Sequence, residues 1–600
     1  MAKPPDITIE KVSLEPDTVP NDGKGSARVS AAVSPAAKGS SITQVLLDLT
    51  CLSEGEQLQL PLEPEGNRDD NGNAIYSAGI RVPLLTDPGV YELPLVATDS
   101  QGKSATGHAR LGITYQRPRY GGDISSSEGR AALQKAGNTA MVPGNRVEVL
   151  TEGEHAFKKR MEMIKKAQKQ INLQTYFISS SGWSGELLEA MLMKAGEGVE
   201  VNLIINMSTQ IAVSPLTTLQ LGLKSKRGEI EDNRQALTEL SRDLPELEKL
   251  ARENDKQKVN LILVDDKAIL GQEPRPVQNG KRSRKWLEKM VRDRRELEKW
   301  DQARSPEWMY GFSGPGGLPS LPMLSYAVHE KILTVDADKA VVGGRNLEDK
   351  YFTYWIDKDV YLEGPVVKDI RKGFLQSFNL FAANQRRNLD ITDLEGEQKT
   401  EPGKKEVCFV QSRPWLDQYY TMDFLVTAFQ LARERILITS QYIVLPDSLL
   451  KDALLDAARR GVEVHVLMNS QETNQEVGYS TGYFLSLNYL EDLINAGIRV
   501  YEIKGPEKQA RQKSYLHAKE FLIDGKWTII GSFNLTIRSC YIESENLVGI
   551  PDPFITRIQE EVFWKRIEMD TTEITRDYLE QARQRSKART AIARYLELLF

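Results

Sequence analysis

The sequence predicts an α/β fold built from two related tandem lobes that follow an all-β segment. Two observations predict it. Short alternating or apolar runs, separated by turn-forming residues, fill residues 5–116. After them, a strand–helix–strand order occurs twice, and each copy leads to the same polar motif beginning His-x-Lys. A repeated strand–helix–strand order is typical of α/β lobes with buried strands.

Residues 1–116 read as short strands. Alternating or apolar runs occur at residues 7–9, 27–30, 45–49 and 58–60. Residues 89–99, followed by the turn Ser100-Gln101-Gly102 and another alternating run, resemble the last hairpin of bacterial immunoglobulin-like domains. We therefore expect an immunoglobulin-like β-sandwich over residues 1–116. The polar segment 117–145, with its glycine and serine clusters, is predicted to be a linker.

The remaining chain predicts a first lobe over residues 146–395 and a second lobe, with C-terminal helices, over 396–600. Residues 195–206 are echoed by residues 458–469, with Gly198 and Gly461 placed as helix stops before buried strands. The first copy is longer, which predicts insertions at about 210–257 and 267–325. The second insertion directly precedes the first motif and is placed to shape access to it.

Both motifs have one spacing, His-x-Lys, four residues, Asp, six residues, then Gly-Gly/Ser-x-Asn. A chance match to five fixed positions is of order one in a million per start site. The first copy supplies His329, Lys331, Asp336, Gly344 and Asn346, and the second supplies His517, Lys519, Asp524, Ser532 and Asn534.

This set of side chains suits cleavage of a phosphodiester. One neutral histidine attacks phosphorus and forms a phosphohistidine, while the other, protonated, gives its proton to the leaving oxygen. Lysine cations and asparagine amides stabilise the non-bridging oxygens, so we expect neither a metal nor another cofactor. One motif supplies half of this machinery. The duplication therefore predicts that the lobes face each other across a pseudo-twofold axis and share one site.

With these motifs the chain resembles the phospholipase D superfamily, and most closely its bacterial cardiolipin synthase-like branch, over roughly residues 146–570. The branch's other segments match Trp355–Val360 with Gly364-Pro365, and Arg538-Ser539 with Glu545. Basic residues that the branch carries around the first histidine are replaced here by Ala327 and Glu330.

The resemblance implies two phospholipase D-like α/β/α sandwich lobes that form one active site. It implies that His329 is the nucleophile and His517 the acid and base. Asp357 and Glu545 are the carboxylates implied to orient the histidines. It further implies structural roles for Asp336 and Asp524, and we assign Gly344 and Ser532 to substrate binding.

The substrate that we expect is a glycerophospholipid, reached by peripheral membrane association. Residues 281–304 are basic with tryptophans on one helical face, which suits an anionic membrane or an ordinary surface helix. Residues 308–324 form an apolar, glycine- and proline-rich stretch that suits either an acyl-chain groove or a buried loop. The alternative is a nuclease of the same superfamily that cleaves DNA or RNA, which the net charge of −6 disfavours.

The remaining composition excludes other classes. The sequence has no GxxxxGK(S/T), HExxH or CxxC pattern, so P-loop hydrolysis and simple zinc chemistry have no support. No apolar run approaches the ~18 residues of a membrane span, and the start has no secretory signal. Three scattered cysteines favour a reducing compartment. We expect a cytoplasmic protein; leaderless export is the alternative, because immunoglobulin-like domains often work outside the cytosol.

Overall fold

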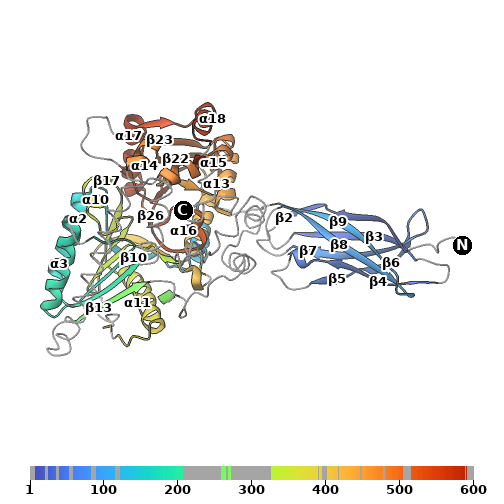
Figure 1. Cartoon of the computed structure of the whole chain (residues 1–600), viewed down its shortest axis with the longest axis horizontal. Coiled ribbons are helices and arrows are strands. Elements are labelled where there is room, and N and C mark those ends of the chain that lie inside the picture. Colours follow the sequence, from blue (N-terminus) through green and yellow to red (C-terminus); the bar gives the residue numbers. More distant parts are fainter. Residues whose placement is uncertain are drawn as a thin grey trace, which may run out of the picture. The chain divides into compact units, whose positions relative to one another are not determined.

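The computed structural model of the chain divides into two compact units, residues 1–119 and 120–600, and each is described by itself (Figure 1). The two predicted insertions lie outside the described residues apart from 268–269 and 271. The structure describes residues 7–20, 25–35, 40–52, 58–82, 89–114, 122–179, 182–206, 258–264, 268–269, 271, 326–389, 391–392, 394, 402–416, 418–445, 449–476, 480–504, 515–587 and 589–590.

The first unit consists of two sheets around one hydrophobic core. Alternate residues of a strand point inward, as Val29 and Ala31 do, because successive side chains of a strand face opposite sides. One sheet has the order β1(Thr8–Glu15), β3(Ser26–Ser34), β7(Ala74–Arg81), β6(Glu63–Arg68). The other has the order β2(Thr18–Pro20), β9(Ser104–Thr114), β8(Gly89–Asp99), β4(Ile42–Asp48), β5(Gln59–Pro61), with a 3-10 turn at η1(Thr50–Leu52).

The second unit is built on one long mixed sheet. Its first half has the order β13(Lys258–Val264), β12(Glu200–Asn206), β11(Gln170–Thr175), β15(Ile332–Val335), β16(Lys339–Gly343), β18(Asp359–Glu363), β10(Val142–Leu150). Its second half continues from β10 with β19(Lys405–Ser412), β28(Glu543–Ile550), β26(Trp527–Gly531), β25(Glu520–Ile523), β20(Arg435–Thr439), β22(Glu463–Asn469), β23(Arg499–Ile503), β29(Thr571–Glu573).

Apart from the edge strand β29, which pairs antiparallel with β23, the strands of the two halves follow the same order from the outer edge of the sheet toward its middle. In each half three neighbouring strands run parallel, and the next pairings toward the middle of the sheet are antiparallel. Gly198 and Gly461, with φ of 95° and 87°, end the helices before β12 and β22, as predicted. The internal duplication in the sequence is therefore a duplication of structure.

Helices cover both faces of the sheet in each half. In the first half, α2(Gly153–Lys166) and α3(Gly182–Gly196) cover one face and α11(Val367–Asn384) the other. In the second, α12(Tyr420–Leu431) and α13(Leu449–Arg459) cover one face and α17(Pro553–Asp570) the other. Further helices in the described part of this unit are α10(Asp349–Thr353), α14(Gln471–Glu476), α15(Ser480–Asn495), α16(Ile537–Tyr541), α18(Arg576–Arg585) and the 3-10 turn η4(Pro414–Leu416).

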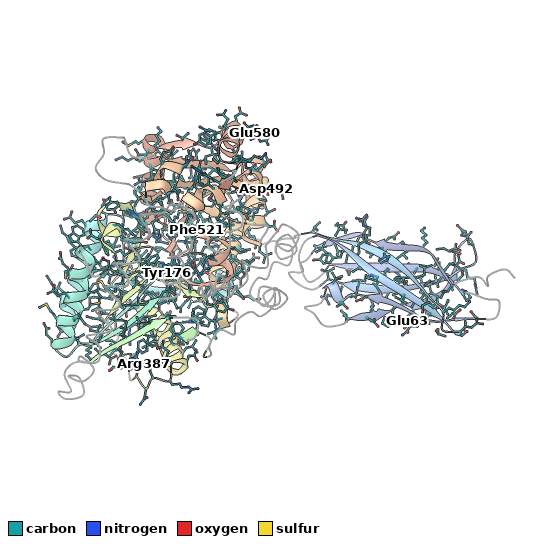
Figure 2. The ribbon with its side chains drawn as sticks, viewed as in Figure 1. Glu63, Tyr176, Arg387, Asp492, Phe521 and Glu580 are labelled. Atoms are coloured by element: carbon teal, nitrogen blue, oxygen red, sulfur yellow. The ribbon has the colours of Figure 1, made fainter. Side chains whose placement is uncertain are left out.

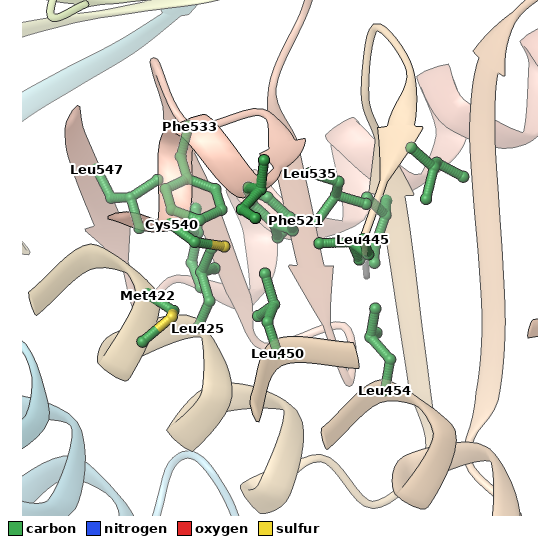
Figure 3. Close-up of a cluster of buried hydrophobic side chains, with 14 of the residues drawn as sticks. Met422, Leu425, Leu445, Leu450, Leu454, Phe521, Phe533, Leu535, Cys540 and Leu547 are labelled. Carbon is green, nitrogen blue, oxygen red and sulfur yellow. The ribbon is translucent and has the colours of Figure 1, made fainter. Parts of the chain in front are cut away.

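The largest core lies under α12 and α13 of the second half. Figure 3 shows Met422 and Leu425 of α12 facing Leu547 of β28, with Leu450 of α13 beneath Phe521 of β25. Figure 2 places Phe521 in the interior of this unit and the acidic Asp492 and Glu580 at its outside. No helix in the described part of the chain is long and apolar enough to cross a membrane.

The predicted linker 117–145 differs from the structure. Helix α1(Ser127–Ala136) and the first residues of β10 lie within it and belong to the second unit. Leu133 of α1 is fully buried in the main core, and the helix packs on α12. The serine cluster that suggested a linker instead begins the helix, because the Ser126 hydroxyl accepts a bond from the N–H of Gly129.

Candidate active site

Each motif histidine follows a two-residue strand that pairs with the other half of the unit. β14(Ala327–Val328) pairs with β28, and β24(Tyr515–Leu516) pairs with β17(Trp355–Ile356). The N–H of His329 donates to the carbonyl of Ser544 at 3.1 Å, and the N–H of His517 donates to that of Ile356 at 2.8 Å. The two halves therefore exchange strands at the start of both motifs.

Two asparagines at the ends of equivalent strands fix these exchanged segments. Asn206, at the end of β12, accepts a bond from the N–H of Val328 at 3.3 Å. Asn469, at the end of β22, accepts from the N–H of Leu516 at 2.9 Å and donates to its carbonyl at 2.7 Å. The repeated segments 195–206 and 458–469 thus end in residues that hold the strand before each histidine.

Each histidine is held by a carboxylate from the opposite half. His329 Nδ1 lies 3.0 and 3.1 Å from the two carboxylate oxygens of Glu545, and His517 Nδ1 lies 2.7 Å from Asp357 Oδ2. A proton on Nδ1 suits these contacts and leaves Nε2 as the reactive nitrogen. The structure thus brings Asp357 and Glu545 to the histidines, and each pair contains one residue from each half.

The two motif lysines lie beside the histidines. Each ammonium group donates to the main-chain carbonyl of its own motif histidine, and Lys519 Nζ lies 2.9 Å from His517 Nδ1. The Nδ1 proton is already directed at Asp357, so this approach is a close contact of two donors. Burial lowers the pKa of Lys331 to about 8 and that of Lys519 to about 7. An anionic substrate would raise both pKa values again.

Both histidines have lowered pKa values. Burial lowers the pKa of His329 well below its ordinary value, and the charges of Lys331, Lys519 and His517 lower it further. The pKa of His517 is lowered well below its ordinary value by burial, then by the same two lysines. Both rings therefore lie in one electrostatic environment, and both are neutral in the empty site.

The carboxylate of Glu545 is embedded in donors. The hydroxyl of Ser539 donates to it at 2.5 Å, and the hydroxyl of Ser532 donates to its other oxygen. Glu543 approaches His329 Nδ1 at 4.0 Å and receives a 2.8 Å bond from Arg538. The ligand atoms of His329, Glu543 and Glu545 lie close enough together to hold a metal ion. The serines and Arg538 already engage these carboxylates, so the group fits a metal poorly.

Gly344 and Ser532 serve the carboxylates in the structure, which differs from their assignment to substrate binding. A Cβ on Gly344 would lie 2.1 Å from Asp357 Oδ1, so only glycine leaves room for that carboxylate. Ser532 uses its hydroxyl on Glu545. The N–H groups of Gly344 and Ser532 donate to the carbonyls of Lys358 and Asn546 at 3.0 Å each. Their donors are therefore used within the protein.

The two motif asparagines differ in their contacts. Asn346 donates to the Tyr351 hydroxyl at 2.8 Å and accepts from the N–H of Phe177 at 3.3 Å. The amide of Asn534 has no hydrogen-bond partner among the described residues, and its buried Oδ1 is unsatisfied. The second asparagine is therefore the one whose amide is free for an incoming oxygen.

Asp336 and Asp524 lie away from the histidines and hold the starts of equivalent strands. Asp336 accepts bonds from the N–H groups of residues 168–170, just before and at the start of β11. Asp524 accepts from the N–H groups of residues 433–435 in the same position before β20. These contacts are with main-chain N–H groups, and the structural role that the resemblance implies remains a prediction.

Aromatic neighbours of the histidines were missed by the sequence analysis. Tyr176 meets His329 edge-on at 4.8 Å between ring centres, and Tyr351 meets His517 edge-on at 4.9 Å (Tyr176 is labelled in Figure 2). The ring of Tyr176 also lies 5.1 Å below Lys331 Nζ. A tyrosine recurs at equivalent places before the two motifs, as Tyr176 and Tyr442, and this repeat was visible in the sequence, whereas no pattern indicated Tyr351 or Glu543.

Residues 425–567 match the family model described as cardiolipin synthase, PLD-like domain. The chain is 30% identical over 259 residues to cardiolipin synthase A of Pseudomonas fluorescens, covering 42% of this chain and 50% of the relative. It is 29% identical over 231 residues to cardiolipin synthase 2 of Bacillus anthracis, covering 37% of this chain and 41% of the relative. The chain thus spans half or less of the length of these relatives.

Among solved structures, phosphatidylserine synthase of Haemophilus influenzae is 12% identical with a TM-score of 0.45. That match covers 78% of this chain and 99% of the other.

Proposed function

We propose that this chain, which carries a phospholipase D-like domain of the cardiolipin synthase type, cleaves or exchanges the phosphodiester of a glycerophospholipid through a phosphohistidine. Its two halves would be phospholipase D-like lobes that share one pseudo-twofold site, and its first unit an immunoglobulin-like sandwich. The observation that carries the proposal is the pair of crossed contacts, His329 with Glu545 and His517 with Asp357. A site assembled this way requires both halves.

In the proposed reaction, Nε2 of His329 attacks phosphorus and the bond to the leaving alcohol breaks. The bound phosphate anion favours the charged form of His517, so this ring takes up a proton from solvent on Nε2 while the Nδ1 proton stays directed at Asp357. His517 then gives that Nε2 proton to the alcohol oxygen. His517 then takes a proton from an incoming alcohol or water, whose oxygen attacks phosphorus and breaks the P–N bond. The leaving alcohol and the incoming one use the same side of the site in turn, so the chemistry permits both hydrolysis and transfer.

The assignment of the nucleophile to His329 comes from the resemblance, and the charges around it support the choice. A ring phosphorylated at Nε2 and protonated at Nδ1 is a cation. Glu545 contacts Nδ1 of His329, and Glu543 lies 4.0 Å away, so two carboxylates stabilise that cation. The residue equivalent to Glu543 beside His517 is Trp355.

The non-bridging oxygens would be bound by the ammonium groups of Lys331 and Lys519 and by the amide of Asn534. Binding of the substrate anion favours the charged lysines, which compensates for the lowering of their pKa by burial. We also propose peripheral contact with a membrane, because the substrate is a lipid and the matching relatives are cardiolipin synthases by name.

The test is to incubate the whole chain with phosphatidylglycerol vesicles, phosphatidylcholine vesicles and single-stranded DNA, and to identify products by mass spectrometry. We expect lipid turnover, which His329→Ala and His517→Ala each lower by about 10³-fold or more. His155→Ala is the matched control, because this side chain is half exposed and forms an ion pair with Glu148, outside the motifs. Turnover should survive EDTA. Nicked DNA without lipid turnover would contradict the lipid activity and support the nuclease activity instead. Full turnover by the His329→Ala or His517→Ala variant would contradict both activities.

A further inference from the structure

We propose that Glu330, the residue between His329 and Lys331, is a positioning residue that locks the two halves of the unit behind the first histidine. The inference rests on the proposed function of that histidine. Its equivalent in the second motif is Ala518, so the feature belongs to one motif only. The starting observation is a carboxylate that is 1% exposed and belongs to neither histidine–carboxylate pair.

Glu330 accepts hydrogen bonds from both halves of the unit. Gln174 of β11, in the first half, donates at 2.5 Å. Gln411 of β19 donates at 2.5 Å and Ser544 of β28 at 2.9 Å, both from the second half. Three donors on one buried carboxylate keep the ends of three strands at fixed distances from each other.

The network continues to a helix of the first half. Arg413 donates to Gln411 at 2.6 Å and also to the carbonyl of Gly373 in α11 at 2.7 Å. A Cβ on Gly373 would lie 2.3 Å from the Gln411 amide oxygen, so a larger residue here would displace the Gln411 side chain from its present position. Burial raises the pKa of Glu330, and the charge of Arg413 and the three donors lower it.

Ser544 connects this network to the histidine. Its carbonyl accepts the N–H of His329, and the next residue is Glu545, which holds His329 Nδ1. Glu330 therefore fixes both the main chain of His329 and the strand that carries its carboxylate partner. Loss of the Glu330 hydrogen bonds should displace Nε2 of His329 relative to phosphorus. Substrate binding through the lysines and Asn534 should persist.

The second histidine is held differently. The N–H groups of His517 and Ala518 both donate to the carbonyl of Ile356. Behind them, Lys358 of the first half donates to Glu520 at 2.7 Å and to Gln559 at 2.8 Å. Different sets of hydrogen bonds therefore hold the two histidines in place. A change at Glu330 should affect the position of His329 and leave that of His517 unchanged.

The test compares kcat and KM of Glu330→Ala, Glu330→Gln and Ser544→Ala on bis(4-nitrophenyl) phosphate, with thermal unfolding measured in parallel. Glu330→Ala should lower kcat by about 10–100-fold and leave KM within about threefold. Glu330→Gln should keep kcat within about threefold of the parent, because the Gln174 amide can turn over and accept the new N–H with its unsatisfied oxygen.

Thr528→Val is the matched control for Ser544→Ala, because Thr528 is equally buried and its hydroxyl also makes one side-chain bond, to Thr556 at 3.0 Å. We expect both variants to lower the midpoint temperature of unfolding by a similar amount. Ser544→Ala should nevertheless lower kcat severalfold more than Thr528→Val does. Equal kcat in Ser544→Ala and Thr528→Val overturns the inference, and this comparison holds even if Glu330→Ala does not fold. A folded Glu330→Ala with kcat within about twofold of the parent also overturns it. Activity in the His329 and His517 variants would instead remove the proposed function.

Discussion

At the scale of single residues, the site combines two buried lysines with two buried neutral histidines. Burial lowers the pKa of Lys519 to about 7 and that of Lys331 to about 8, from an ordinary value near 10.5. In the unfolded chain both lysines bind protons up to about pH 10. Between about pH 7 and 10 the unfolded state therefore binds more protons than the folded state. In the empty enzyme these lysines should make the free energy of unfolding rise with pH over this range.

An anion that binds between the lysines should reverse this effect. Sulfate binding should take up protons between pH 7 and 9, and its affinity should fall by up to about tenfold per pH unit for each proton taken up. Calorimetry in two buffers of different ionisation enthalpy measures the proton uptake. Lys519→Met should bind sulfate more weakly and with a shallower pH dependence. An affinity that stays constant from pH 6 to 9 would contradict the placement of the lysines at the anion.

The sequence predicted the histidines and lysines because each has a fixed spacing within its motif, and the family resemblance implied the carboxylates Asp357 and Glu545. It could not predict which carboxylate serves which histidine. Glu545 follows the second motif but holds the first histidine, and this crossing depends on strand pairing between residues more than 200 positions apart. The contacts of Tyr351, Glu543 and Glu330 were missed for the same reason, since each is made across the fold.

At the scale of elements, the duplicated strand order was readable because buried parallel strands and their helix stops leave strong patterns. The aspartates five residues after each lysine accept bonds from the N–H groups at the start of these strands. Asp336 and Asp524 have φ of 52° and 53°, a left-handed conformation that aspartate tolerates better than most residues. Helix α1 was missed because its serine cap, taken alone, has the composition of a linker.

The role of these aspartates can be tested by substitution. Asp524→Ala leaves the N–H groups of residues 433–435 without their acceptor and should cost about 1–3 kcal/mol in the free energy of unfolding. Asp524→Asn should cost less, because it keeps one acceptor oxygen and tolerates the positive φ. Urea denaturation measures both. A stable Asp524→Ala that has lost all turnover would make Asp524 a direct participant in the reaction.

At the scale of the whole molecule, the β-rich unit of residues 1–119 has its own core, and the site belongs entirely to residues 120–600. Within that larger unit, two structurally equivalent halves exchange the strands before their histidines. Each half also supplies the carboxylate that orients the other half's imidazole. Neither half on its own contains a complete histidine–carboxylate pair.

A crystal structure of the whole chain with vanadate, an analogue of the phosphoryl group in transfer, tests most directly whether both histidines act on one phosphorus atom. We expect one vanadium centre bonded to Nε2 of His329, with Nε2 of His517 on the opposite side at hydrogen-bond distance from a vanadate oxygen. Vanadate bound by one histidine alone, or two vanadates in separate clefts, would contradict the claim that both halves act on a single phosphorus.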